Sequence, residues 1–401
     1  MILPSCEARK LLMFDVESGG HHAEYALHLL RGLSARLPGV ATVLAVPQEM
    51  LDRQPELALA GVEAAPLPPP GPPGNPWAVS KTQWACLHKV VQTYRPTDVL
   101  LLYADSLLPT LARHASLPGR PRLATIHFRP PVSEGDSTVR ERVRDIVKRY
   151  HLRRALSHPD LRAAFSLDPR AVPTLRAQSR ATVVALPDPV GAPVLTPDER
   201  TVSCQNLRSQ FRVGPDQHLM VLFGALARRK GIFEVLGAIR CMPEAWASRL
   251  TVAFVGPVDA GDATEFAAAV AVTTAESAAN LVVRSSFITD GREIEALLSA
   301  ADTVLLPYQR HIGSSAVLIR AAALQRPTIC QDYGLVGEWT RAHRLGRSVD
   351  STDPKVLAKA FCAAIADPSG GLDADASAAF AAAHTPEAFV TTVLDGLAAM
   401  R

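Results

Sequence analysis

Short runs of apolar residues, each followed by a helical pattern, recur along this chain, and the series starts twice. The first series begins at residues 11–16 and the second at residues 218–223. Each run is apolar throughout rather than alternating, as in parallel strands that helices cover on both faces. Strands that alternate with helices form right-handed crossovers and an open parallel sheet. The sequence therefore predicts two Rossmann-like α/β domains, with further strands at 41–46, 98–102, 123–126, 250–255, 281–283, 303–306 and 328–330.

A stretch rich in proline and glycine separates the two series and contains Pro187, Pro189, Gly191, Pro193 and Pro197. Proline fixes φ and lacks a backbone donor, which favours a linker here. We expect a first domain over residues 1–190, a second over 191–385, and a C-terminal helix over 386–401 that packs back on the first. A similar stretch at 66–76 predicts an exposed loop or, alternatively, a proline-rich ligand for a partner domain.

Charge and cysteine content limit the classes of function. The chain of 401 residues has a formal net charge of +3, which gives no basic surplus for nucleic-acid binding. Its six cysteines are scattered without CxxC pairs, which argues against a metal site and favours free thiols in a reducing cytoplasm. No apolar stretch approaches the roughly 20 residues that span a bilayer, and no signal peptide is visible, so we predict a cytoplasmic protein.

Candidate ligand-binding residues follow the predicted strands, because open parallel sheets bind ligands at the carboxyl ends of their strands. In the first half, Gly19 and Gly20 precede a helix that starts near Ala23. They indicate either a ligand-binding loop or a simple tight turn. His127 follows the strand at 123–126. It is a candidate catalytic residue that orients a substrate or transfers a proton, and the alternative is a structural histidine.

In the second half, a run of three cations, Arg228, Arg229 and Lys230, precedes a helix at 232–239. The positive end of the helix dipole and the cationic side chains together favour a diphosphate. The alternative is a solvated basic turn. We favour the anion site because the cations follow a strand rather than line a helix face.

A second candidate anion site is the segment Gly313, Ser314 and Ser315, which precedes a helix at 316–324. It supplies two hydroxyl groups and the amides of a helix N-terminus, both suited to phosphate. The alternative is that Ser315 does no more than cap the helix.

Taken in order, these pieces give the second half a resemblance to a known family. The matching pieces are Gly224…Lys230-Gly231, Phe254-Val255-Gly256, Phe287-Ile288, Ala300-Ala301-Asp302…Leu306-Pro307, Gly313-Ser314-Ser315, Arg320-Ala321-Ala322-Ala323 and Arg326-Pro327. In order and spacing they resemble the retaining GT-B glycosyltransferases of the family-4 or group-1 class, over about residues 219–346. In the first half, Gly19-Gly20 and His127 stand where this family has an acceptor-side loop and a histidine near the transferred sugar.

The resemblance implies a GT-B architecture, in which the parallel sheets of two Rossmann-like domains face a central cleft. It implies hexosyl transfer from a nucleotide-diphosphate sugar, with retention of anomeric configuration. Lys230 with Arg229 would neutralise the diphosphate, and the backbone at Ile288 would face the base. The donor site would also include Gly313, Ser314, Ser315 and Arg320. No metal or other cofactor is implied, and the acceptor would be a glycan, a lipid-linked sugar or a protein.

The sequence departs from the pattern of this family in two respects. The family has an arginine at the place of Ala225, and two glutamates at the places of Ile312 and Arg320. The second glutamate normally accepts hydrogen bonds from the ribose, which a guanidinium cannot do. Two alternatives to transfer therefore stay open. One is a non-catalytic GT-B-like protein that binds a nucleotide, a glycan or a protein partner, and the other is a GT-B sugar epimerase.

Arg320 itself should lie early in its helix, and a buried cation needs a counter-charge. We expect that partner to be an acid such as Asp332 or Glu338, or an anionic group of the donor, and we favour the donor.

Residues 140–154 are rich in arginine and lysine, with Val143, Ile146, Val147 and Leu152 interleaved. We favour a solvated helix whose apolar side packs on the core. The alternative is a helix that lies on an anionic membrane, which would suit a lipid-linked acceptor and a peripheral location at the inner face of the membrane.

Overall fold

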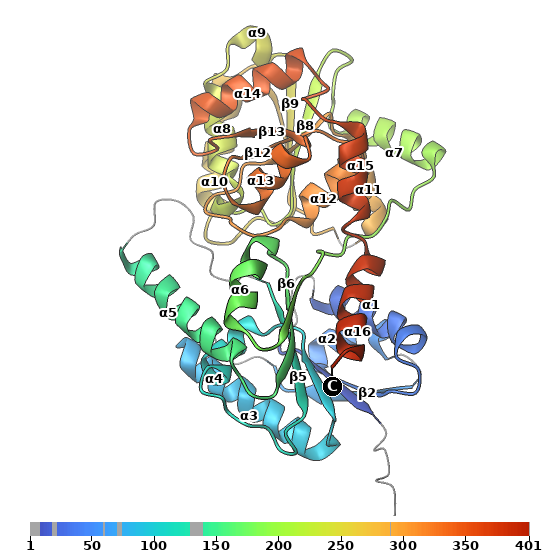
Figure 1. Cartoon of the computed structure of the whole chain (residues 1–401). Coiled ribbons are helices and arrows are strands. Elements are labelled where there is room, and N and C mark those ends of the chain that lie inside the picture. Colours follow the sequence, from blue (N-terminus) through green and yellow to red (C-terminus); the bar gives the residue numbers. More distant parts are fainter. Residues whose placement is uncertain are drawn as a thin grey trace, which may run out of the picture. The chain divides into compact units, whose positions relative to one another are not determined.

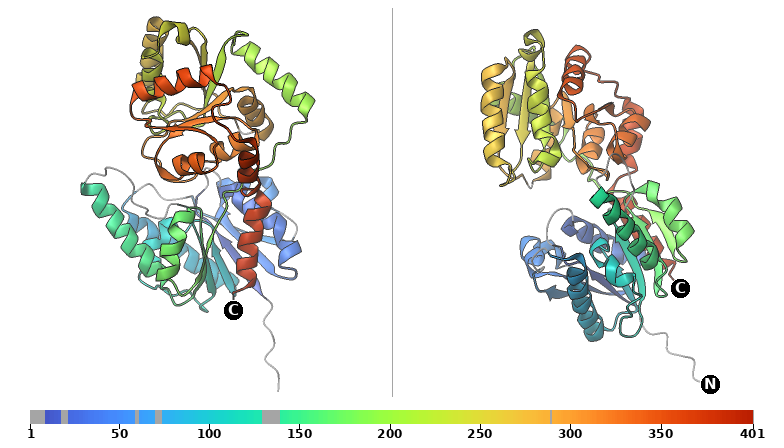
Figure 2. Two further views of the ribbon diagram at one scale, coloured as in Figure 1. Left: turned by 45° about the horizontal axis from the view of Figure 1, so that its top comes forward. Right: turned by 90° about the vertical axis from the view of Figure 1, so that its left-hand side faces the viewer.

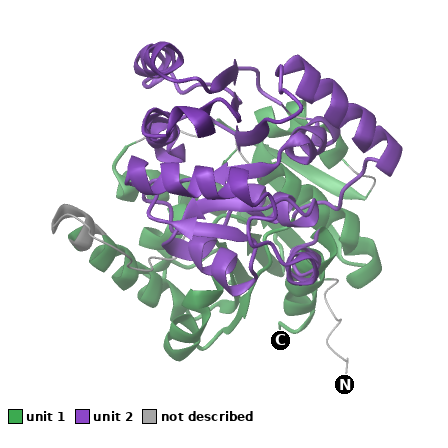
Figure 3. Cartoon of the chain, turned by 90° about the horizontal axis from the view of Figure 1, so that it is seen from above, with its two compact units in different colours: residues 1–189, 386–401 green, residues 190–385 purple. Residues whose placement is uncertain are grey.

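The computed structural model describes residues 9–17, 22–58, 61–69, 74–128, 139–288 and 290–400, without the side chains of 139–142 and 144. The chain divides into two compact units (Figure 3). Unit 1 comprises residues 1–189 together with 386–401, and unit 2 comprises residues 190–385.

Unit 1 contains a seven-stranded parallel sheet in the order β3-β2-β1-β4-β5-β6-β7 (Figure 1). Its strands are β1 Lys10–Phe14, β2 Ala41–Pro47, β3 Val62–Leu67, β4 Asp98–Leu101, β5 Arg122–His127, β6 Leu161–Ser166 and β7 Thr182–Ala185. Its helices are α1 His22–Arg36, α2 Gln48–Arg53, α3 Pro76–Tyr94, α4 Leu108–Leu111, α5 Val139–Leu156, α6 Val172–Gln178 and α16 Pro386–Ala398, with short 3₁₀ turns η1 Pro55–Leu57, η2 Asp105–Leu107 and η3 Pro169–Ala171.

Two hydrophobic clusters form the core of unit 1, one on each face of the sheet. In β1, Leu12 and Phe14 belong to one cluster, whereas Leu11 and Met13 belong to the other. Successive side chains of a strand point to opposite faces, so a strand with both faces covered must be apolar throughout. Figure 2 shows the helices on both faces of the sheet.

The last helix, α16, packs against α1 although the two are far apart in the sequence (Figure 1). The approach is close, since a Cβ atom on Gly32 would lie 2.3 Å from Cγ1 of Val390. At the C-terminal end of α16, the guanidinium of Arg122 donates to the carbonyl of Met400 at 2.7 Å. A cation at this end of a helix complements its dipole. The same guanidinium pairs with the buried Asp98, which ties α16 to the sheet.

Unit 2 contains a six-stranded parallel sheet in the order β10-β9-β8-β11-β12-β13. Its strands are β8 His218–Phe223, β9 Leu250–Val255, β10 Asn280–Arg284, β11 Thr303–Leu306, β12 Thr328–Gln331 and β13 Gly346–Val349. Its helices are α7 Pro197–Gln210, α8 Ile232–Arg240, α9 Glu244–Ala247, α10 Ala263–Glu276, α11 Gly291–Ala300, α12 Ala316–Ala323, α13 Gly334–Ala342, α14 Pro354–Ala366 and α15 Ala374–Ala382, with the 3₁₀ turn η4 Arg228–Lys230.

The predicted fold class is confirmed, because each unit contains one parallel sheet covered by helices. Every predicted strand is present, and four further strands, β3, β6, β7 and β13, were not predicted. Among the described residues, no helix has both the length and the apolar character that crossing a membrane requires. The five described cysteines are free thiols.

Candidate functional site

Each sheet has one topological switch point, where the strand order reverses. In unit 1 the reversal lies between β1 and β4, and in unit 2 it lies between β8 and β11. In open α/β sheets, the loops after two such strands leave in opposite directions, and a crevice forms between them at the carboxyl edge of the sheet. The residues that follow β1, β4, β8 and β11 are therefore the first candidates for ligand binding.

At the switch point of unit 2, the side chain of Lys230 links the loop after β8 to the loop after β11. Its ammonium nitrogen donates to the hydroxyl of Tyr308 at 2.8 Å and lies 4.0 Å from the centroid of that ring. Lys230 is only 9% exposed. In the part of the chain that the structure describes, no carboxylate pairs with this ammonium. A buried cation without a counter-charge is costly, which indicates an anionic ligand.

Glycines let the loops of this crevice approach one another closely. Gly231 has φ +75°, and a Cβ atom there would lie 2.1 Å from the carbonyl oxygen of Pro307. Gly256 has φ +137°, and a Cβ atom there would lie 2.1 Å from the carbonyl oxygen of Gly224. Both positions combine a positive φ with a contact that no side chain can accommodate. Gly231 therefore brings the loop of Lys230 against the end of β11, and Gly256 brings the loop after β9 against the loop after β8.

Ser315 occupies the N-cap position of α12, but its side chain does not cap the helix. Its hydroxyl lies 3.1 Å from that of Tyr308, so that Lys230, Tyr308 and Ser315 form one hydrogen-bonded chain. The carbonyl of Ser314 lies 2.9 Å from Nε2 of His311. The interpretation of Ser315 as a mere side-chain cap is thus wrong, and the amides at the start of α12 lie beside the lysine site.

The three consecutive cations have different surroundings. Arg228 is bound by acids on or next to α10. Its backbone amide donates to the carboxylate of Asp262 at 2.7 Å, and its guanidinium pairs with Glu265. Arg229 is exposed, and its side chain makes no hydrogen bond or ion pair with any residue that the structure describes. Its carbonyl accepts the amide of Gln309 at 2.8 Å, which places the backbone of Arg229 next to the loop after β11.

Arg320 lies in the middle of α12 rather than early in it, as the fifth of its eight residues. Its side chain is half-buried. It makes no hydrogen bond, ion pair or ring contact with any other described residue. Asp332 and Glu338 are both described and neither pairs with Arg320, which rules out the less favoured alternative for these two acids. The guanidinium is available to a ligand.

Ile288 has its side chain in the core of unit 2, where it is 6% exposed, so only its backbone can face a ligand. The neighbouring Phe287 is 75% exposed and lies beyond the end of β10.

In unit 1, His127 ends β5 and is 2% exposed. Its Nδ1 lies 3.3 Å from Oδ1 of Asp105, and its Nε2 lies 3.0 Å from the hydroxyl of Thr125. The other carboxylate oxygen of Asp105 accepts the amide of Phe128 at 3.1 Å. Both ring nitrogens are therefore engaged, and the imidazole is held in one orientation. Gly19 and Gly20 lie outside the described residues.

A second imidazole at the switch point of unit 1 was not predicted from the sequence. Nδ1 of His22, at the start of α1, lies 2.8 Å from the carboxylate of Asp15, which follows β1. The His22 ring stacks on Phe128 with centroids 5.1 Å apart and meets Tyr103 edge-on at 5.0 Å. No described residue hydrogen-bonds its Nε2. The only signal in the sequence is an acid at the end of a strand and a histidine at the start of the next helix.

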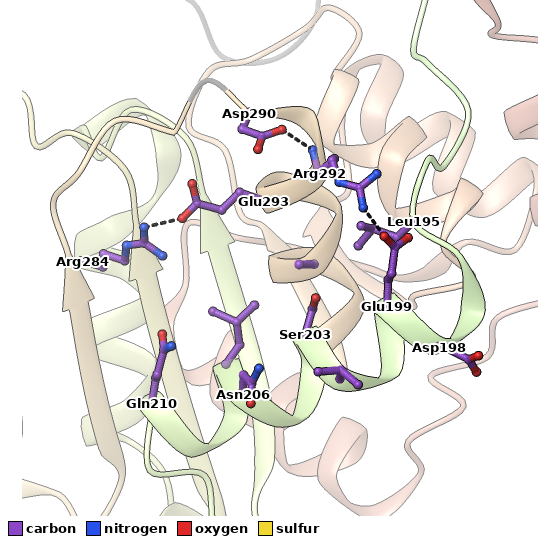
Figure 4. A pocket seen from close by; sticks show the side chains of 13 residues that line it. Leu195, Asp198, Glu199, Ser203, Asn206, Gln210, Arg284, Asp290, Arg292 and Glu293 are labelled. Atoms are coloured by element: carbon purple, nitrogen blue, oxygen red, sulfur yellow. Dashed lines mark hydrogen bonds and ion pairs between the residues drawn. The ribbon is translucent and has the colours of Figure 1, made fainter.

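A separate pocket of about 860 Å³ lies between α7 and α11 of unit 2 (Figure 4). Its charged side chains pair with one another, Arg292 with Glu199 at 2.6 Å and Arg284 with Glu293. None of the predicted site residues lines it. Because its arginines already have counter-charges within the protein, this pocket lacks the unpaired cation that distinguishes the β8/β11 crevice.

Over the described ranges, no group of three or more His, Cys, Asp or Glu side chains is arranged to hold a metal ion.

Comparison with known proteins supports the family resemblance. Residues 217–367 match the family model of glycosyl transferases group 1. HepE of Anabaena in complex with UDP and glucose is similar with a TM-score of 0.69 at 15% identity, over 97% of this chain and 99% of that chain. Sucrose-phosphate synthase of Thermosynechococcus elongatus is similar with a TM-score of 0.70 at 15% identity, over 96% of this chain and 97% of that chain. The UDP-forming α,α-trehalose-phosphate synthase of Burkholderia vietnamiensis is similar with a TM-score of 0.66 at 12% identity, over 98% of each chain. No curated protein matches the chain by sequence.

Two parallel sheets with these switch points, together with full-length similarity to such structures, define a protein of the GT-B fold. The predicted fold class is thus confirmed at the level of the GT-B architecture. Within unit 2, residues 217–367 match a domain of the glycosyl transferases group 1. The predicted resemblance, based on residues 219–346, is confirmed by a match over nearly the same span.

Proposed function

We propose that this chain transfers a hexosyl group from a nucleotide-diphosphate sugar to a hydroxyl of an acceptor, with retention of configuration and without a metal ion. The observation that carries the proposal is the buried ammonium of Lys230 at the β8/β11 switch point. It donates to Tyr308 and has no carboxylate partner within the described residues. A diphosphate would supply the missing counter-charge.

The diphosphate would be neutralised by protein groups alone. Lys230 provides a buried charge, and the exposed Arg229 lies on the same loop. The segment Gly313, Ser314 and Ser315 precedes α12, where the amides of the helix N-terminus and the helix dipole add partial positive charge. Groups fixed in this way stabilise the charge that develops on a leaving diphosphate.

We infer that the donor is a uridine diphosphate sugar. The support comes from structures of HepE with UDP and with UDP-glucose, which share this fold at 15% identity. The backbone at Ile288, just beyond the carboxyl end of β10, would face the base, since its side chain is buried in the core.

Arg320 narrows the class of sugar. A guanidinium that no described residue pairs with attracts phosphate or carboxylate groups, often through two hydrogen bonds. We propose that it contacts an acidic group of the donor, either the carboxylate of an acidic sugar or a phosphate oxygen.

The acceptor would be bound by unit 1. Asp15 holds Nδ1 of His22 by a hydrogen bond, and an imidazole that donates through Nδ1 and carries no second proton has Nε2 as an acceptor. We propose that this nitrogen accepts a hydrogen bond from the acceptor hydroxyl. His127 would contact the transferred sugar, which requires its Nε2 to exchange the Thr125 hydroxyl for a sugar hydroxyl. Glycans, lipid-linked sugars and proteins all carry suitable hydroxyls.

One observation favours a second candidate, a GT-B protein that binds a nucleotide without transferring a sugar. Arg320 cannot accept hydrogen bonds from a ribose, unlike the glutamate of the family that the chain resembles. Release of UDP from a UDP-sugar in the absence of an acceptor would distinguish the enzyme from this alternative. Recovery of an isomerised UDP-sugar would reveal an epimerase.

We place this activity in the cytoplasm. The support is the five free cysteines among the described residues, four of which, Cys86, Cys204, Cys330 and Cys362, have thiol pKa values raised by burial. Raised pKa values keep thiols protonated, and a reducing compartment keeps them free.

A thermal-shift screen against uridine, UMP, UDP, UDP-glucose and UDP-glucuronic acid tests the proposal. A ligand that binds only the folded state stabilises it by about 2.7 kcal/mol at a hundredfold excess over the dissociation constant. We expect UDP to raise the melting temperature more than UMP, because Lys230 binds the diphosphate. The absence of a shift with every diphosphate would contradict the proposed donor site.

A further inference from the structure

Helix α5, Val139–Leu156, carries apolar side chains on two opposite sides. Leu152, Ala155 and Leu156 are buried where the helix packs against α4 and α6 (Figure 1). Val143, Ile146, Val147 and Tyr150 are exposed, at 55%, 57%, 45% and 62%. The expectation that the apolar side of residues 140–154 faces the core is therefore correct for Leu152 and wrong for Val143, Ile146 and Val147.

The exposed apolar residues of α5 form one continuous stripe, because positions i, i+3, i+4 and i+7 share a helix face. Among the described residues, ten large apolar side chains are exposed, and four of them belong to this stripe. Such residues are unremarkable when they are scattered singly, whereas a continuous exposed patch marks a surface that contacts something apolar. The stripe is thus a candidate interaction surface.

Aromatic side chains extend this surface at its edge. Trp77, at the start of α3, is 36% exposed and meets the ring of His151 of α5 edge-on at 4.9 Å. The guanidinium of Arg113 lies 4.2 Å from the centroid of the Trp77 ring. Tryptophan and tyrosine beside cationic groups are typical of segments that lie in the headgroup region of a bilayer.

The described charges beside the stripe are positive. Among the described side chains, Arg149, Arg153 and Arg154 are exposed on α5, and Arg154 continues the stripe four residues after Tyr150. Asp145 is half-buried. It lies seven residues before the buried Leu152, on the side of the helix that faces the rest of unit 1. An apolar partner helix would gain nothing from three cations around its contact. A bilayer with anionic headgroups would gain from each of them, because cations near such a surface are attracted by its potential.

We propose that the stripe of α5 binds an anionic lipid bilayer, with Val143, Ile146, Val147 and Tyr150 inserted at the level of the headgroups. The cations and Trp77 then lie beside lipid phosphates and carbonyls. An amphipathic helix of this kind binds in the plane of the interface, with a strength set by its apolar area and its charge. The inference does not rest on the proposed donor site, because lipid binding is measured without a sugar nucleotide.

Flotation of the full-length chain with phosphatidylcholine vesicles, with and without phosphatidylglycerol, tests this proposal. We expect flotation with the anionic vesicles only, and a loss of flotation as the salt concentration rises, since salt screens exposed charges. The double variant Ile146→Ser, Val147→Ser should reduce the bound fraction by about tenfold through the loss of apolar contact. The variant Arg153→Gln, Arg154→Gln should make the remaining binding less sensitive to salt.

A matched control is the double variant Val202→Ser, Val272→Ser, which removes two exposed valines from α7 and α10 and should float like the unmodified chain. Equal melting temperatures for all variants establish that folding is unaffected. A chain that stays unbound with anionic vesicles at low salt would overturn the proposal. A dimer in solution that the α5 double variant converts to monomers would assign the stripe to a second copy and would also overturn it.

Discussion

The two switch points have the same position in their sheets but different chemistry. Unit 2 places a lysine ammonium against a tyrosine hydroxyl, with helix amides beside it. Unit 1 places an imidazole against a carboxylate, among the rings of Tyr103 and Phe128. The first arrangement provides positive charge, whereas the second provides a hydrogen-bond acceptor and apolar faces. A diphosphate requires the former, and a sugar hydroxyl is suited to the latter. In the transfer reaction proposed above, the same fold would bind two different substrates through different residues after a few strands.

The largest effect should follow from Lys230→Ala. Removal of one fixed group that stabilises developing charge lowers turnover by about 100-fold or more. UDP release from the donor that the screen identifies measures this turnover. The matched control is Lys355→Ala, which removes an exposed lysine of the same unit and should leave the rate unchanged. Similar rates for the two variants would show that the crevice of unit 2 does not stabilise the diphosphate.

Arg320→Ala should have the next largest effect, limited to donors that carry an extra acidic group. A hydrogen bond to a charged group contributes about 1.5–3 kcal/mol, which corresponds to roughly 10- to 100-fold in affinity. The test is to measure the affinities of the unmodified chain and of Arg320→Ala for UDP-glucuronic acid and for UDP-glucose. If the acidic sugar and the neutral sugar lose affinity equally, Arg320 contacts the shared diphosphate instead. Unchanged affinity for both would exclude Arg320 from the donor site.

His22→Ala should act on the other crevice and have a smaller effect. The loss of one neutral hydrogen bond to the acceptor, or to a water molecule in its place, lowers UDP-sugar hydrolysis by about tenfold. Asp15→Asn should produce a similar loss, since it disturbs the tautomer that presents Nε2. The affinity for UDP should stay unchanged in both. If either variant retains the full rates of hydrolysis and transfer, His22 and Asp15 have a structural role only.

The smallest effect concerns pH, and it should appear in both units. Burial lowers the pKa of His158 in unit 1 and of His218 in unit 2 below the ordinary value. Both histidines then stay neutral in the folded state at a pH where the unfolded chain binds a proton. Stability should be flat above about pH 7 and should fall as the pH drops through about 6.5, by about 1.4 kcal/mol for each unit of pKa difference. Denaturant unfolding of His158→Gln and His218→Gln at several pH values measures each contribution. If neither variant reduces the loss of stability at low pH, other groups are responsible for that loss.

The sequence predicted the fold best where strands are covered on both faces. The runs at 218–223, 250–255 and 303–306 coincide with β8, β9 and β11, because a short, continuous apolar run is typical of a strand buried on both sides. Three of the four missed strands, β3, β7 and β13, lie at sheet edges, where exposed and polar positions interrupt the run. The fourth, β6, contains Arg162 and two alanines, which give too little apolar signal.

The candidate site was predictable only in part. Lys230 stands out because three cations follow a strand, but its contact with Tyr308 depends on how the crossovers bring β8 beside β11. The pairing of Arg228 with Glu265 depends in the same way on the position of α10. For α5, periodicity shows that apolar faces exist, whereas only the neighbouring helices determine which face is covered. Long-range contacts of this kind leave no local pattern in a single sequence.

The most direct test of the division between the two crevices is calorimetric titration of UDP into the unmodified chain, Lys230→Ala and His22→Ala at low salt. Lys230→Ala should lose about tenfold or more in affinity, because a charged hydrogen bond to the diphosphate is removed. His22→Ala should bind UDP like the unmodified chain. An unchanged affinity in Lys230→Ala, or an equal loss in His22→Ala, would contradict the assignment of the diphosphate to unit 2 and of the acceptor to unit 1.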